Sequence, residues 1–223
     1  MERRHSEIGG TVSLTRPRVR RPAAIELLAL AYGLGVVGTA WDWYEHLIGP
    51  GTQPPHVLID LSGLLVLGVL AFSGKIDPRS RSFTILYVLL VLVALIGFGP
   101  FVLMMAAPRS QLMADLMRGM MSSGALLVYV PLVLLAIWSA WRWLSLAAIR
   151  WWHLAAALGI VVVAVGTVWD LYWHQTHPME VGASMATLPP HQMIFAGFVI
   201  GFVGSVYGAA PQLLRRRTKG TVF

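Results

Sequence analysis

Six long apolar segments follow one another along the chain, separated by shorter polar stretches. They cover roughly residues 23–46, 56–73, 83–106, 119–141, 152–174 and 191–213. A helix needs about 20 apolar residues to cross the hydrocarbon core of a bilayer, which is about 30 Å thick. The pattern therefore predicts an all-α, polytopic bundle of six transmembrane helices, with the lipid bilayer as its first partner.

The polar stretches divide the chain into a membrane domain and two tails. Residues 1–22 form a basic tail, residues 23–213 the transmembrane domain, and residues 214–223 a second basic tail. Within the domain we distinguish a first hairpin over 23–73, a central hairpin over 83–141 and a last hairpin over 152–213.

The composition agrees with a membrane protein. Hydrophobic residues make up 57% of the chain and charged residues 12%, against about 45–50% and about 25% in soluble domains. This excludes a soluble enzyme and a nucleic-acid-binding domain, despite the net charge of +7. The chain has no cysteine, so a metal would have to be held by His, Asp, Glu or Met.

The basic residues predict the orientation of the bundle. Cytoplasmic flanks of membrane helices carry an excess of Lys and Arg. If the N-terminus lies inside, 15 of the 17 basic residues are cytoplasmic, and only Arg109 and Arg118 are outside. We therefore expect a multi-pass protein of the cell inner or plasma membrane, with both termini in the cytoplasm. Topology then explains the positive charge, and no nucleic acid is needed as a partner.

The first and last hairpins share a sequence motif. VGTAWDWYEH at 37–46 and VGTVWDLYWH at 165–174 are identical at seven of ten positions. Each is followed by a loop and then by Pro-Pro-His, at 54–56 and at 189–191, and the second loop is seven residues longer. The pattern predicts a parallel internal repeat, in which helices 1–2 and 5–6 have the same topology.

Each copy of the motif places one Asp and two His at the outer end of a hairpin. Residues four apart lie on one helix face, and prolines in the first turn leave a His at the start of the next helix. Two imidazoles and a carboxylate form a suitable shell for a transition metal. The alternative is a set of Asp–His pairs that staple the hairpins. The predicted ligands, all on the extracytoplasmic side, are Asp42, His46, His56, Asp170, His174 and His191.

Other residues near the outer face bear on the identity of the metal. Imidazole suits copper, zinc and iron, whereas thioether favours Cu(I). Apart from Met1, all nine methionines lie in or near the outer half, so we favour copper over zinc or iron. Methionine also fills gaps in packing, which is the alternative. Asp60 is a candidate to orient His56, and His177 is an alternative ligand in the second copy.

The motif Asp-x3-His, a loop and Pro-x-His resembles the C subunit of the copper membrane monooxygenases, which include particulate methane, ammonia and short-alkane monooxygenases. Asp170, His174 and His191 match the family's Asp-His-His copper ligands. Asp42, His46 and His56 match the general pattern, with Asp where the family's second site has Asn. The loops between the two histidines, nine and 16 residues long here, depart from the nearly equal loops of the family.

The resemblance implies a function for the predicted sites. Such a subunit would work with other membrane subunits and would help to oxidise a small substrate, a hydrocarbon or ammonia, with O2. Two alternatives stay open on the residues alone. One is a protein for extracytoplasmic copper uptake, delivery or sensing without oxygenase activity, and the other is a haem protein with paired histidine ligands.

Overall fold

The computed structural model describes residues 24–48, 53–73, 81, 84–85, 87–89, 91, 123–146, 149–177 and 188–219. Within these ranges the secondary structure is helical, without strands. The long helices are α1 (Ala24–Ile48), α2 (Gln53–Phe72), α5 (Ser123–Leu146), α6 (Trp151–Thr176) and α7 (Pro189–Lys219). Each begins within about four residues of its predicted start, so the all-α fold class is confirmed for the described residues.

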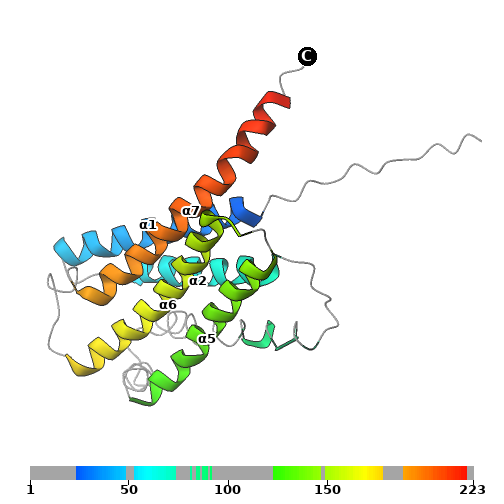
Figure 1. Cartoon of the computed structure of the whole chain (residues 1–223). Helices are drawn as coiled ribbons and strands as arrows, with labels where there is room; N and C mark the ends of the chain where they lie inside the picture. Colours follow the sequence, from blue (N-terminus) through cyan, green and yellow to red (C-terminus); the bar gives the residue numbers. More distant parts are fainter. Residues whose placement is uncertain are drawn as a thin grey trace, which may run out of the picture.

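Helix α7 extends further than predicted. Its apolar segment was expected to end at residue 213, but the helix continues to Lys219 and includes Pro211. Proline removes one hydrogen bond inside a helix and clashes with the preceding turn. The residues that follow it, Gln-Leu-Leu-Arg-Arg-Arg, are strong helix formers, and the helix resumes. Figure 1 shows this end of α7 projecting beyond the other helices.

Four helices of the described part are long and apolar enough to cross a membrane. They are α1, the segment Pro54–Phe72 of α2, α6, and the segment Pro189–Pro211 of α7, with mean hydropathies from 1.5 to 2.1. The structure thus has the helices of a membrane protein. The helix expected over 83–106 falls almost wholly outside the described residues, so the number of six spans stays a prediction.

The two hairpins that carry the sequence motif pack against each other through α1 and α7. Helix α7 contacts both α6 and α1, and α1 also contacts α2 (Figure 1). Helix α5 packs against α6 and α2. The core between the helices is apolar, and its fully buried side chains include Tyr32, Phe198, Leu28, Leu67, Leu70 and Ile160.

Glycines allow the close approach of α7 to its neighbours. A Cβ atom on Gly197 would lie 2.8 Å from the carbonyl oxygen of Gly159 in α6, and a Cβ on Gly35 in α1 would overlap the ring of Phe198. The Tyr32 ring occupies the corresponding space beside Gly201, and its hydroxyl donates a hydrogen bond to the Ala156 carbonyl. Small residues at helix contacts are the usual means of bringing membrane helices together.

Candidate metal centre

The first group of predicted ligands lies where α1 ends and α2 begins. Asp42 and His46 are one turn apart on the buried face of α1. Pro54 and Pro55 occupy the first turn of α2 and leave His56 directly after them. The Oδ1 atom of Asp42 lies 3.5 Å from His46 Nε2 and 3.4 Å from His56 Nε2. The hairpin therefore brings both imidazoles to the same carboxylate.

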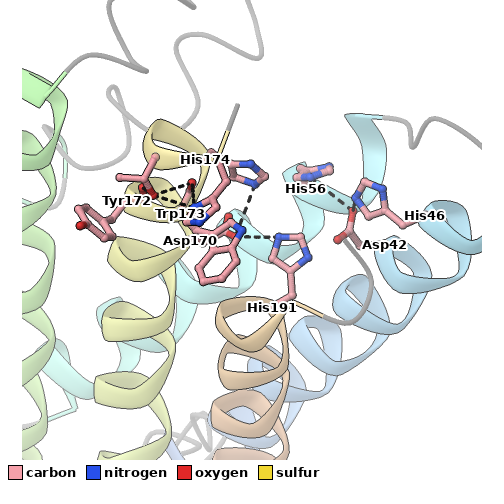
Figure 2. Close-up of polar contacts among 10 residues, drawn as sticks. Asp42, His46, His56, Asp170, Tyr172, Trp173, His174 and His191 are labelled. Carbon is pink, nitrogen blue, oxygen red and sulfur yellow. Dashed lines mark hydrogen bonds and ion pairs between the residues drawn. The ribbon is translucent and has the colours of Figure 1, made fainter. Parts of the chain in front are cut away.

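The second group has the same arrangement where α6 ends and α7 begins (Figure 2). Asp170 and His174 are one turn apart on α6, and His191 follows Pro189 and Pro190 at the start of α7. Asp170 Oδ1 lies 3.6 Å from His174 Nε2 and 2.8 Å from His191 Nε2. In each group, one ligand atom from every residue lies within 4.8 Å of the other two.

Equivalent residues pack around the helical turn that precedes the aspartate of each group. A Cβ on Gly38 would lie 3.1 Å from Ile59 Cγ1, and one on Gly166 would lie 2.9 Å from Ile194 Cγ1. Ile59 and Ile194 each follow the second histidine of their group by three residues. The absence of a side chain at the glycine therefore lets the second helix approach, which brings its histidine to the carboxylate.

In both groups, the threonine that precedes the aspartate makes an equivalent hydrogen bond within its own helix. Thr39 Oγ1 donates to the Gly35 carbonyl at 2.8 Å, and Thr167 Oγ1 donates to the Val163 carbonyl at 2.9 Å. Each threonine lies three residues before the aspartate of its group. These bonds satisfy the hydroxyls within their own helices, so neither threonine needs to bond to the aspartate.

The two groups differ in burial. Asp42 and His46 are buried, with 7% and 6% of their surface exposed, and the His56 side chain is 39% exposed. In the second group the side chains of Asp170 and His174 are both 23% exposed, and that of His191 is 16% exposed. The two α1 residues of the first group are therefore more deeply buried than His56. In the second group, all three side chains are exposed to a similar extent.

Several polar atoms of the groups have no hydrogen-bond partner among the described residues. They are Oδ1 of Asp42, Oδ1 of Asp170 and both ring nitrogens of His46. His191 Nε2 lies within ion-pair distance of Asp170 Oδ1, at 2.8 Å. A buried polar group without a partner is costly and calls for an explanation such as an ion. Carboxylate and imidazole atoms that converge on one point fit a cation held between them.

The other candidates from the sequence lie outside the two groups. His177 follows the last residue of α6, its ring stacks on Trp173 at 4.2 Å, and it is exposed. Asp60 and Met193 are half-buried, and Asp60 belongs to neither group of ligand atoms. Some of the predictions fall on residues that the structure does not describe: the N-terminal tail, Arg109, Arg118, Met104, Met105, Met113, Met117, Met120, Met121, Met179 and Met185.

Comparison with known proteins adds no relative to this picture. No protein-family model, no curated protein and no solved structure matches the chain. The functional argument therefore rests on the residues of the chain and on their geometry.

Proposed function

We propose that this chain is an integral membrane protein that binds metal ions, with copper as the favoured metal, through two Asp-His-His groups at one end of its helix bundle. The observation that carries the proposal is the convergence of two His Nε2 atoms on one Asp Oδ1 in each hairpin, at 2.8–3.6 Å.

The geometry supports metal binding better than it supports a structural staple. A staple would pair each aspartate oxygen with an imidazole N–H in a hydrogen bond, because an ion pair at membrane depth is stable only when its polar atoms are satisfied. Asp42 Oδ1 and Asp170 Oδ1 accept no hydrogen bond in the described part of the chain. A cation bonded to the carboxylate and both imidazoles would satisfy these atoms together.

The identity of the metal rests on ligand chemistry. Neutral imidazole and carboxylate accept copper, zinc or iron, and among divalent ions copper binds such donors most tightly. Three protein ligands leave coordination positions open for an external molecule. The methionines that the sequence predicts near the outer face favour copper further. Of these, Met193 lies two residues after His191 and is half-buried.

We also propose the topology that the charges indicate. Both termini lie in the cytoplasm, and the metal-binding end of the bundle faces the extracytoplasmic side of the inner or plasma membrane. The two hairpins are copies of one parallel repeat. The supporting observations are the equivalent packing at Gly38 and Gly166 and the equivalent hydrogen bonds of Thr39 and Thr167.

The reaction is proposed on the resemblance alone. In a copper membrane monooxygenase, a chain of this kind would be a C-type subunit that works with other membrane subunits on a small substrate and O2. Bound copper would supply one-electron redox chemistry at the open coordination positions. The chain's own residues would hold the metal and keep the site at the edge of the apolar bundle.

The first test is the metal content of the full-length protein in detergent. We expect copper-loaded wild type to retain copper and to give a type 2 Cu(II) signal in electron paramagnetic resonance (EPR) spectra. The variant Asp170→Ala/His174→Ala should lose the copper of the second group. His177→Ala is the matched control, because His177 lies next to the second group without belonging to it, and it should keep the wild-type content.

The same measurement distinguishes the alternatives. Binding of zinc alone, or a metal content that does not depend on Asp170 and His174, would overturn the copper proposal and leave the Asp–His pairs as staples. Copper that binds and exchanges freely, in a protein that purifies without partner subunits and does not react with O2, would favour copper uptake or delivery over the monooxygenase role. A Soret band would indicate haem.

A further inference from the structure

The two ligand groups are next to each other in space, although 128 residues separate their aspartates in sequence. The His46 ring of the first group lies 6.0 Å from the His191 ring of the second, centroid to centroid, with the ring planes tilted by 31°. His56 lies 6.1 Å from His46, and His174 lies 6.1 Å from His191. Four imidazoles therefore form a continuous row across two hairpins (Figure 2).

The row is held by the contact between α1 and α7. Beside the two groups, the Trp43 ring meets the Phe195 ring edge to face at 6.1 Å. Deeper in the bundle, Phe198 fills the space that Gly35 leaves open and is fully buried. Because interiors of this kind are close-packed, the two hairpins cannot separate freely, and the spacing of His46 and His191 is a fixed feature of the fold.

His46 provides a second, independent observation. It is 6% exposed, and neither of its ring nitrogens has a hydrogen-bond partner among the described residues. A neutral imidazole carries one N–H donor and one acceptor nitrogen, and burying both without partners is unfavourable. Its ring lies 6.1 Å from that of His56 in its own group and 6.0 Å from that of His191 in the other. This buried side chain is therefore suited to a ligand held at the junction of the two groups.

The donor sets also suit two cations. Each group supplies one carboxylate and two imidazoles, so the pair of groups has two carboxylates for two metal ions. Each set is complete without donors from the other, because its three ligand atoms lie within 4.8 Å of one another. One ion in each group provides every carboxylate with its own cation.

We propose that the two groups form a single two-metal centre, in which His46 and His191 lie between two copper ions close enough to interact magnetically. This inference rests on the proposed function, because it requires that each group binds copper. It goes beyond that function by assigning the number of ions and their coupling, and by making the centre depend on the packing of one hairpin against the other.

The test is a Cu(II) titration of the full chain in detergent, followed by EPR spectroscopy. We expect two copper ions per chain in wild type, with a half-field transition or an integrated signal smaller than the bound copper. The variant Asp42→Ala/His56→Ala disables the first group without changing His46, and Asp170→Ala/His174→Ala disables the second without changing His191. Each should bind one copper with a full, uncoupled signal.

Three outcomes would contradict the inference, and they can be distinguished. Two coppers in wild type, with a spectrum equal to the sum of the two single-group variants, would overturn the coupling but keep the proposed function. A single copper per chain in wild type would overturn the two-metal centre. No copper binding in wild type would overturn the proposed function itself. If the alanine variants do not fold, Asp42→Asn and Asp170→Asn preserve the side-chain shape, and helicity measured by circular dichroism verifies folding.

Discussion

His191 Nε2 lies 2.8 Å from Asp170 Oδ1, whereas the equivalent atoms of His56 and Asp42 are 3.4 Å apart. The two pairs occupy the same positions in the two motifs, and each connects the end of one helix to the start of the next. The aspartate is the common partner of both histidines in each group, so its charge is the first feature to test.

Asp170→Asn should weaken copper binding by the second group at least about tenfold, which corresponds to about 1.4 kcal/mol. The amide keeps an oxygen at the same place but removes the negative charge that attracts the cation. Competition with a chelator of known affinity measures the change. Asp42→Asn should weaken the first group in the same way, and an unchanged affinity in both variants would show that the carboxylates are not ligands.

Gly38→Ala and Gly166→Ala should each lower the copper affinity of their own group and leave the other unaffected. The new methyl group would lie 3.1 Å from Ile59 Cγ1 or 2.9 Å from Ile194 Cγ1. The second helix then has to move outward, which takes its histidine away from the aspartate. Gly63→Ala is the control, because nothing lies within 4 Å of its Cβ position. An equal loss in the control would refute this account.

Gly197→Ala should destabilise the bundle by about 1–3 kcal/mol, the usual cost of overpacking. Its methyl group would meet backbone atoms of α6, at 2.8 Å from Gly159 O, and backbone cannot move aside as a side chain can. Thermal unfolding in detergent, followed by circular dichroism, measures the effect. Gly68→Ala, with open space at its Cβ position, should leave the unfolding temperature unchanged or raise it. Equal stability of the two variants would contradict the glycine contact.

Tyr32→Phe should cost about 1 kcal/mol of stability and leave the copper content unchanged. The hydroxyl of this fully buried side chain donates to the Ala156 carbonyl, and a hydrogen bond of this kind contributes about 0.5–1.5 kcal/mol. Tyr32→Ala removes the ring that fills the space beside Gly201 and should cost more, about 3–5 kcal/mol. If both variants unfold at the wild-type temperature, the contact between α1 and α6 does not contribute to stability.

Single cysteines test the proposed orientation, because the natural chain has none. Thr176→Cys places a thiol at the end of α6 that carries the ligands, and Ser145→Cys places one near the end of α5. Both positions are exposed. In intact cells, a maleimide that cannot cross the membrane should label only the first variant. Labelling of the second variant alone would reverse the topology.

The positions of the helices and the composition of each ligand group could be predicted from sequence because both depend on local spacing. Apolar runs of about 20 residues marked α1, α2, α5, α6 and most of α7. The spacing of Asp42 and His46 put them on one face, and Pro54 and Pro55 indicated where α2 begins. The continuation of α7 past residue 213 to Lys219 was missed, because the apolar pattern ends before the helix does.

The relation between the two groups could not be predicted in this way. Nothing in the local sequence says that His46 lies 6.0 Å from His191, or that His177 lies outside the second group. Hydrophobic periodicity places residues within a helix, but it does not select the neighbour of that helix. That choice depends on the shapes of side chains far apart in the chain, such as Phe198 beside Gly35 and Tyr32 beside Gly201. The sequence by itself determined two sets of candidate ligands. Only the packing of α1 against α7 made them neighbours, because close contact between helices requires complementary surfaces along their whole length.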